Sequence, residues 1–216
     1  MTPIPSLARI LQCWCLALAL AGPLFAAQTY RGFTIDESAV RDQPDLTAIL
    51  SATREQIDLV HAVGAPAEVL TFFASVKFDL VPADTFKSPT PGRYTGRTAR
   101  SVQVSAAILS TGHKPVLLHE LLHAYHDQRI EHGFDNPAIL ELYGKARSIP
   151  AFAAKSHMMS NEKEYFACAA TAYLFGVTAQ EPFSRGKIRE NQPELYGYLQ
   201  KLFGRDAGRY EGSLTR

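Results

Sequence analysis

Cysteine is scarce in this sequence, and its positions exclude a domain held together by disulfides. Two of the three cysteines, Cys13 and Cys15, lie in an N-terminal segment that we expect to be removed, and Cys168 then remains alone. A single cysteine forms no internal disulfide, even in an oxidising compartment. The stability of the 216-residue chain must therefore come from a hydrophobic core or from a bound metal.

Neither sign of charge is in excess. The chain has 22 basic and 21 acidic residues, and the numbers become equal if Arg9 leaves with the N-terminal segment. Proteins that bind nucleic acids usually show a basic excess or a basic stripe, so we expect no nucleic-acid partner. The sequence also has no internal repeat or low-complexity tract, and its length fits one globular domain, which we expect to be monomeric.

The apolar segment near the N-terminus is too short for a membrane-spanning helix. It runs from Ile10 to Ala21, about a dozen residues, whereas a spanning helix needs roughly 20. The preceding Arg9 and the small residues that follow are typical of a signal peptide. We predict a signal peptide at residues 1–27 and a secreted or periplasmic domain at 28–216, without membrane contact after cleavage. An uncleaved anchor is the alternative, because Leu24 and Phe25 make an imperfect cleavage site.

The two halves of the remaining chain differ in their hydrophobic patterns. The first half alternates strand and helix patterns, with strands at 30–36, 76–82 and 101–109, helices at 45–64 and 66–73, and a long loop at 83–99. The second half is helical, with helices predicted at 115–130, 137–147, 162–175 and 193–203. This order predicts an α+β fold of two lobes, with a small N-terminal mixed sheet and helices followed by a helical C-terminal lobe.

The pattern H-E-x-x-H occurs inside the helix predicted at 115–130. Four residues make about one helical turn, so His119 and His123 project side by side and can bind one Zn²⁺ ion. Glu120 lies next to them, where it can take a proton from a water on the metal that then attacks a peptide carbonyl. Apolar neighbours bury this helix, and buried imidazoles and a buried carboxylate need a partner such as a metal.

A zinc site of this kind needs a third protein ligand. The best candidate is Glu164, in the first turn of the helix predicted at 162–175. The spacing of Asn161 and Glu164 also fits a capping box, in which the carboxylate would serve the helix N-terminus instead. Spacing alone does not decide between these roles, and Glu162 and His126 are competing ligands.

The two motifs together resemble a known family. His119-Glu120-Leu-Leu-His123 through Asp127, followed by Asn161-Glu-Lys-Glu164-Tyr-Phe-Ala, is similar to the gluzincin metallopeptidases related to the catalytic domain of anthrax toxin lethal factor. The resemblance extends over about residues 115–204, and it implies a zincin-like fold. It further implies one zinc ion per chain bound by His119, His123 and Glu164, with Glu120 as the general base, and Asp127 matches an acidic position of the family.

The chain departs from that family at two positions. His157 stands where relatives carry a tyrosine thought to stabilise the oxyanion, and a histidine can donate the same hydrogen bond. A surface histidine without a role in catalysis is the alternative for His157. Cys168 stands where relatives often have an acidic residue one turn after the glutamate ligand, and a thiol cannot orient a ligand as a carboxylate does.

The sequence therefore predicts an exported zinc metallopeptidase that hydrolyses peptide or protein substrates, with Glu120 and His157 as catalytic residues. We expect the strand at 101–109 to form the upper wall of the cleft and to hold an extended substrate by strand addition, with the loop at 83–99 at one end. The two departures motivate an alternative, a weak or inactive zinc-binding protein that keeps the fold. A zinc hydrolase acting on non-peptide amides is a third possibility.

Overall fold

A computed structural model describes residues 27–86 and 90–214. The predicted signal peptide, apart from its last residue, lies outside the described residues. Within the described part of the chain, none of the helices combines the length and the apolar character needed to cross a membrane.

The first half of the chain forms one mixed sheet of five strands. The strands are β1 (Gln28–Tyr30), β2 (Phe33–Asp36), β3 (Lys77–Val81), β4 (Gly92–Tyr94) and β5 (Ser101–Ser105), in the order β1-β2-β3-β5-β4. The three inner strands β2, β3 and β5 run parallel, and each edge strand is antiparallel to its neighbour. The sequence prediction of a small N-terminal mixed sheet is thereby confirmed.

One face of the sheet belongs to the core. Side chains alternate along each strand, and the buried ones are Phe33, Ile35, Phe78, Leu80, Val102 and Val104. Thr34 and Lys77 point the other way and are exposed. The helices of the N-terminal half are α1 (Leu46–Ala62) and α2 (Ala67–Ser75), close to the predicted bounds.

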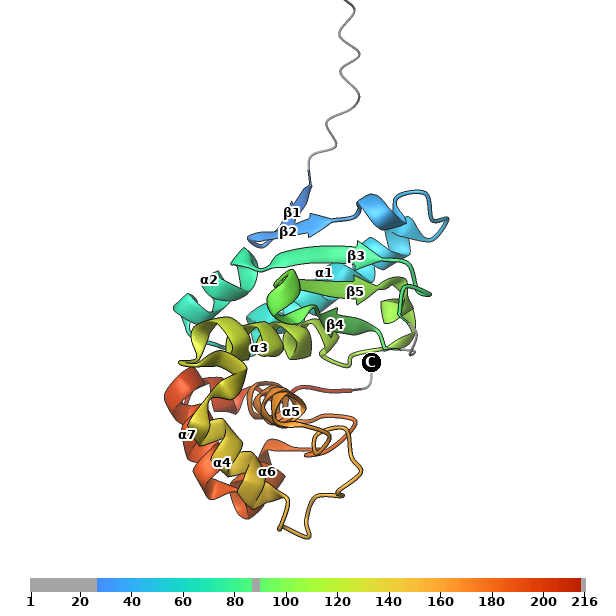
Figure 1. Cartoon of the computed structure of the whole chain (residues 1–216). Coiled ribbons are helices and arrows are strands. Elements are labelled where there is room, and N and C mark those ends of the chain that lie inside the picture. Colours follow the sequence, from blue (N-terminus) through green and yellow to red (C-terminus); the bar gives the residue numbers. More distant parts are fainter. Residues whose placement is uncertain (1–26, 87–89, 215–216) are drawn as a thin grey trace, which may run out of the picture.

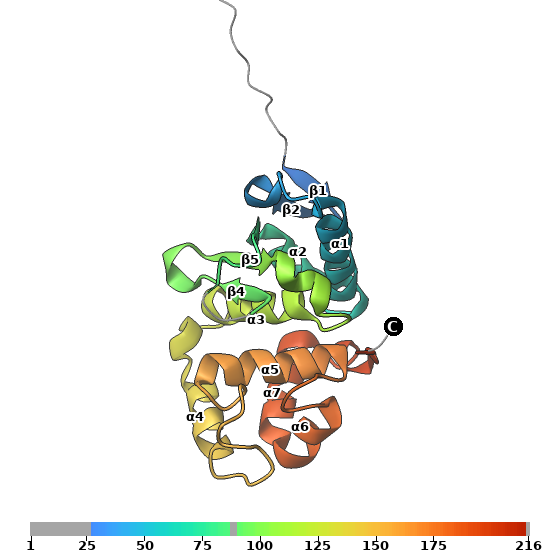
Figure 2. The same ribbon diagram turned by 90° about the vertical axis from the view of Figure 1, so that its right-hand side faces the viewer.

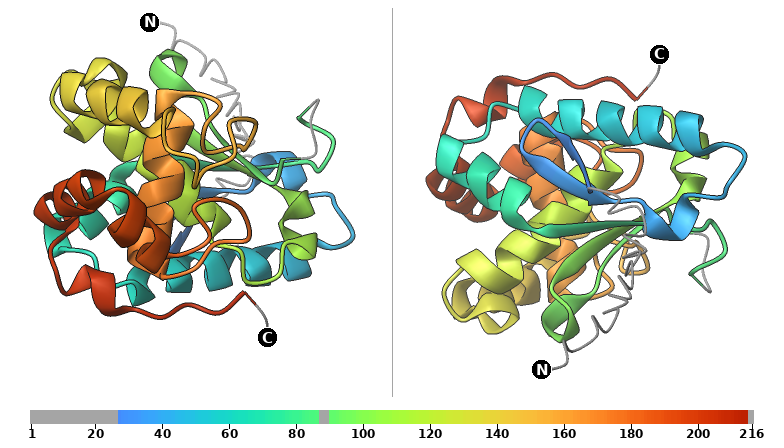
Figure 3. Two further views of the ribbon diagram at one scale, coloured as in Figure 1. Left: turned by 90° about the horizontal axis from the view of Figure 1, so that it is seen from below. Right: turned by 90° about the horizontal axis from the view of Figure 1, so that it is seen from above.

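The second half is helical, with the four predicted helices and one additional short helix that was not predicted, Arg185–Asn191. Its helices are α3 (Val116–Arg129), α4 (Pro137–Ala146), α5 (Glu162–Phe175), α6 (Arg185–Asn191) and α7 (Pro193–Phe203). Figure 1 shows the sheet at one end of the molecule, α3 beneath it and α5 beneath α3. The same stacking appears after a quarter turn in Figure 2, and the view from below in Figure 3 shows α5 crossing the centre with α4 and α7 beside it.

Helices α3 and α5 are the central pair of the molecule. Every residue of α5 from Tyr165 to Phe175 is buried, and nine of the fourteen residues of α3 are buried. Helices that are apolar on most sides belong in the interior of a fold. The alanines at 167, 169, 170 and 172 have small side chains, so neighbouring elements can pack closely against α5. The two sequence motifs therefore lie on the most deeply buried helices.

The strand predicted at 101–109 exists, but it is shorter than predicted, and it lies inside the sheet rather than at its edge. Only Ser101–Ser105 is strand, and Ala106–Ser110 forms a 3-10 helix. Strand β5 also pairs with β3 on one side and β4 on the other, so it has no free edge for a substrate. The edge strand is β4, which lies inside the segment predicted as a loop. Three residues without an apolar alternation give too weak a signal to predict a strand.

Candidate metal centre

Helix α3 brings two imidazoles together. His119 and His123 lie one turn apart, and their Nε2 atoms are 3.2 Å from each other. The start of the helix is fixed by Gln56 of α1, whose side chain accepts from the backbone N–H of Leu117 and donates to the carbonyl of Lys114. Gln56 thus satisfies one of the free amides that every helix N-terminus leaves.

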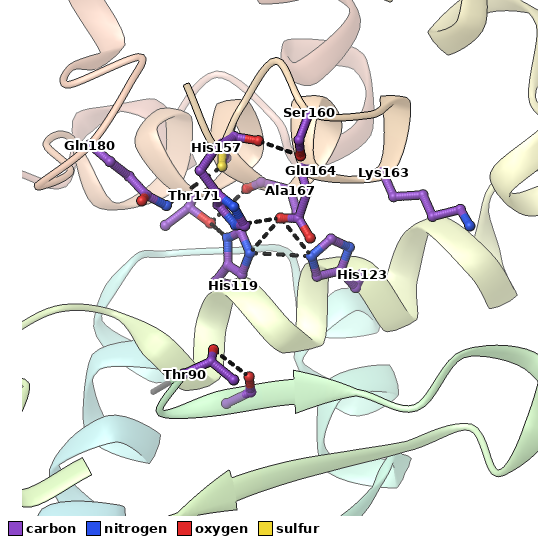
Figure 4. Close-up of polar contacts among 12 residues, drawn as sticks. Thr90, His119, His123, His157, Ser160, Lys163, Glu164, Ala167, Thr171 and Gln180 are labelled. Atoms are coloured by element: carbon purple, nitrogen blue, oxygen red, sulfur yellow. Dashed lines mark hydrogen bonds and ion pairs between the residues drawn. The ribbon is translucent and has the colours of Figure 1, made fainter. Parts of the chain in front are cut away.

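Helix α5 places the third side chain. Asn161 caps this helix, since its side chain accepts from the backbone N–H groups of Lys163 and Glu164. The carboxylate of Glu164 does not complete a capping box; its Oε2 atom lies 3.2 Å from Nε2 of His119 and 3.2 Å from Nε2 of His123. Figure 4 shows the three side chains pointing toward one another across the gap between α3 and α5.

The spacing of these three donor atoms fits a zinc ion. Zinc binds imidazole nitrogen and carboxylate oxygen at about 2.0–2.2 Å in tetrahedral geometry, so two ligand atoms of one ion lie about 3.3 Å apart. All three pairs among His119, His123 and Glu164 are separated by 3.2 Å. A hydrogen bond between these two Nε2 atoms requires one of them to carry a proton, whereas both can donate a lone pair to one cation. The residues present therefore fit zinc.

His157 joins this cluster from the segment before α5. Its Nε2 atom lies 2.9 Å from Oε2 of Glu164, although half of the side chain, 49%, is exposed. The next two residues, Met158 and Met159, are buried, and Tyr143 donates to the carbonyl of Met159. These anchors hold His157 at the rim of the cluster, so it is not a free surface histidine.

The electrostatics of the cluster follow from these contacts. Burial alone would raise the pKa of Glu164, but hydrogen bonds from His119, His123 and His157 outweigh it and hold that pKa far below its usual range. The hydrogen bond to Glu164 in turn raises the pKa of His157 above its ordinary value, against the effect of burial. The carboxylate is therefore ionised at any working pH, as a metal ligand must be.

Glu120 follows His119 in α3 and packs against strand β4 at Gly92. Burial raises the pKa of its carboxyl to about 7; His119 lowers it, Glu164 raises it, and a hydrogen bond from the backbone of Tyr94 lowers it. A Cβ atom added at Gly92 would lie 2.8 Å from Cγ of Glu120 and 2.9 Å from Cγ1 of Val116. Glycine at position 92 thus lets the strand approach the carboxylate. Spacing along the chain does not predict this contact.

Thr171 is a further residue that the sequence did not indicate. Its Oγ1 donates to the carbonyl of Ala167 at 2.7 Å and lies 3.5 Å from Nδ1 of His119. Because the hydroxyl proton is already used, the oxygen is an acceptor for an Nδ1–H of His119. That arrangement leaves the Nε2 lone pair of His119 free for a metal. Thr171 lies seven residues after Glu164, two turns along α5, and only the packing of α5 on α3 brings it to His119.

Cys168 lies beside the cluster. Its sulfur, His119, His157 and Glu164 each offer an atom within 4.8 Å of the others. The side chain is buried, burial raises the pKa of the thiol strongly, and Gln180 Nε2 approaches the sulfur at 3.8 Å. A protonated thiol is a poor metal ligand, so Cys168 packs here as a small apolar side chain.

The other predicted candidates lie elsewhere. The ring of His126 packs between Phe134 and Phe166, with centroid distances of 5.1 and 4.7 Å. Asp127 accepts a hydrogen bond from the hydroxyl of Tyr94 at 2.8 Å rather than from a ligand imidazole. Glu162 is the first residue of α5, in the same turn as Glu164, and of the two carboxylates it is Glu164 that contacts the histidines.

Comparisons with known proteins add little to this geometry. No protein family profile matches the sequence, and no curated protein matches it. Among solved structures, the chain is similar to the Pro-Pro endopeptidase PPEP-2 from Paenibacillus alvei, with 18% sequence identity and a TM-score of 0.49. The match covers 73% of this chain and 92% of that one. At this level the likeness carries no weight for function, which must be argued from the site itself.

Proposed function

We propose that this chain is an exported zinc-dependent metallopeptidase. The observation that supports the proposal most strongly is the triangle of donor atoms from His119, His123 and Glu164, each 3.2 Å from the other two, with Glu120 adjacent. Zinc held by those three side chains would polarise a substrate carbonyl and make a water molecule more acidic. The remaining steps fall to side chains of this chain.

Glu120 is the proposed general base. Its buried carboxyl has a pKa of about 7 in the metal-free protein, and a positive ion beside it would lower that value and favour the carboxylate. The carboxylate then accepts the proton of the attacking water and returns it to the leaving amine. Gly92 and the backbone of Tyr94 approach this carboxylate from strand β4.

His157 is the proposed donor to the developing oxyanion. It lies at the exposed rim of the cluster, and the contact with Glu164 favours its protonated form. A donor at this position stabilises negative charge on the carbonyl oxygen as the tetrahedral species forms. This is the role that the family's tyrosine has in the resemblance described above.

An extended peptide would bind along β4. The bonds from Ser105 N–H to the carbonyl of Pro91 and from Thr95 N–H to the carbonyl of Ser101 show which residues face β5. In an antiparallel pair the alternate residues, Gly92 and Tyr94, direct their backbone groups away from β5. The Gly92 carbonyl accepts from Thr90 Oγ1 at 3.0 Å and the Tyr94 backbone donates to Glu120, so the proposed contacts with a substrate are the Gly92 N–H and the Tyr94 carbonyl. We propose this edge, in place of 101–109, as the upper wall of a cleft between the sheet lobe and the helical lobe.

The test is hydrolysis of a fluorogenic peptide library by the domain at residues 28–216, loaded with zinc, beside its Glu120→Gln variant. We expect the wild type to cleave peptides and the variant to lose activity by about 10³-fold or more while it keeps its zinc. A wild type with full zinc and no cleavage would instead support a zinc-binding protein without turnover. Cleavage of non-peptide amides alone would support an amide hydrolase.

Export is proposed from the N-terminal sequence alone. Expression of the full chain in a bacterium, followed by mass analysis of the periplasmic and extracellular fractions, tests it. A product that begins near residue 28 in either fraction is expected. A cytoplasmic product that keeps residues 1–27 would contradict it.

A further inference from the structure

Strand β4 is a short edge strand that packs against helix α3, which carries the proposed histidine ligands. It has three residues, and only one of its sides is paired with another strand. On the face toward α3, Gly92 lies against Val116 and Glu120, and the hydroxyl of Tyr94 reaches Asp127. A three-residue edge strand is weak on its own, so these contacts with α3 add to its pairing with β5 in holding it in place.

The contact between Tyr94 and Asp127 is the strongest of these. The Tyr94 hydroxyl donates to Oδ2 of Asp127 at 2.8 Å and accepts from Nε2 of Gln128 at 2.9 Å. The Asp127 side chain is only 1% exposed, and its other oxygen lies 3.4 Å from Nε of Arg97, which follows β4 along the chain. A hydrogen bond to a buried carboxylate is stronger than one between neutral groups.

Strand β4 meets α3 at two places along the helix. At Gly92 an added Cβ atom would lie 2.8 Å from Cγ of Glu120, and the Tyr94 hydroxyl bonds to Asp127, seven residues or about two helical turns further along. The Tyr94 hydroxyl therefore ties β4 to α3 at a second point, in addition to the pairing of β4 with β5.

We propose that Tyr94 and Asp127 act as a latch that sets the position of the β4 edge relative to the metal-binding helix, and so positions the substrate. Both are positioning residues, because neither lies among the groups that would touch the reacting atoms. This inference rests on the proposed peptidase function for its kinetic part. The structural part, the hold on β4, stands without it.

The test compares Tyr94→Phe and Asp127→Ala with a matched control. Tyr30→Phe removes a similar hydrogen bond, from Tyr30 to Asp58 at 3.1 Å, on the opposite edge strand β1. Asp127→Asn is the conservative variant, since its amide oxygen still accepts from Tyr94. For each protein the readouts are amide hydrogen exchange at residues 92–95, zinc content, and kcat and KM for the peptide that the wild type cleaves fastest.

We expect Tyr94→Phe and Asp127→Ala to speed exchange at 92–95 and to raise KM about tenfold, with kcat within about threefold and zinc content unchanged. Asp127→Asn should keep KM close to the wild-type value. Tyr30→Phe should change neither the exchange at 92–95 nor KM. Unchanged exchange at 92–95 would overturn the latch. Faster exchange without a change in KM would overturn its role in positioning substrate.

Failure of the proposed function would be seen separately. In that case the wild type itself would cleave no peptide, before any variant is compared. The exchange measurement would then still decide whether Tyr94 and Asp127 hold β4 against α3.

Discussion

The hydroxyl of Thr171 lies 3.5 Å from Nδ1 of His119, on the side of the ring opposite Nε2, the nitrogen that we propose binds zinc. The same hydroxyl donates to the carbonyl of Ala167, so toward His119 it acts as an acceptor. With an Nδ1–H of His119 directed at this acceptor, Nε2, 3.2 Å from Oε2 of Glu164, can offer its lone pair to a metal. Support of this kind commonly decides how tightly a metal ligand binds.

Thr171→Val should therefore weaken zinc binding about 10- to 100-fold, because it removes the acceptor for His119. The measurement is a competition titration with a chromophoric zinc chelator. Thr53→Val is the matched control, since Thr53 Oγ1 makes the same backbone contact in a helix, with the carbonyl of Ile49, far from the site. Equal zinc affinity in the two variants would count against the role given to Thr171.

The buried carboxyl of Glu120 predicts how the stability of the metal-free protein depends on pH. Burial raises its pKa from an ordinary 4.5 to about 7. Between those values the folded protein keeps a proton that the unfolded chain has released, so the free energy of unfolding falls as the pH rises. At pH 8 the loss from this group amounts to at most roughly 3 kcal/mol, since each pKa unit corresponds to about 1.4 kcal/mol.

Urea unfolding of the EDTA-treated protein at pH 5 and pH 8 measures this effect. Glu120→Gln cannot ionise, so relative to wild type the variant should gain stability between pH 5 and pH 8. Glu55→Gln, in α1 away from the histidines, is the control. A Glu120→Gln variant that tracks the wild type at both pH values would show that the carboxyl is not buried as described.

His157→Ala should lower kcat by about 10²- to 10³-fold and leave KM and zinc content nearly unchanged, because a donor to the oxyanion acts only in the transition state. His157→Tyr should restore much of the rate, since a phenol can donate the same hydrogen bond. His61→Ala, in α1, is the control. Loss of zinc from His157→Ala would instead identify His157 as a metal ligand.

Gly92→Ala should lower kcat/KM about 10²-fold, because the new Cβ atom would lie 2.8 Å from Cγ of Glu120 and force the carboxylate or the strand to move. Zinc content should stay the same. Gly144→Ala is the control, since a Cβ atom there meets nothing within 4 Å; as a helical site it should become slightly more stable. Equal activity of both variants with the wild type would refute the steric argument.

The parts of the fold that the sequence predicts well depend on neighbours along the chain. Helix α5 has the predicted bounds, Glu162–Phe175, because Asn161 caps its start and Gly176, with φ of +96°, ends it. The pairing of His119 with His123 likewise follows from one helical turn. These features need no knowledge of the rest of the fold.

The parts that could not be predicted depend on how distant segments pack. Strand β4 carries no periodic pattern, and it is a strand because β5 pairs with it. Thr171 reaches His119 only because α5 lies on α3, and Tyr94 reaches Asp127 only because β4 runs along α3. Spacing in the sequence also could not show whether Glu162 or Glu164 is the third ligand. In the folded helix it is Glu164 that lies against the histidines.

The central claim, a zinc centre built from His119, His123 and Glu164, is tested most directly by elemental analysis. Residues 28–216, stripped with chelator, reloaded with zinc and desalted, would be compared with the Glu164→Ala variant and with Glu162→Ala as the neighbouring control. We predict one zinc per chain in the wild type and in Glu162→Ala, and loss of most of it in Glu164→Ala. Full zinc in Glu164→Ala, or none in the wild type, would contradict the account.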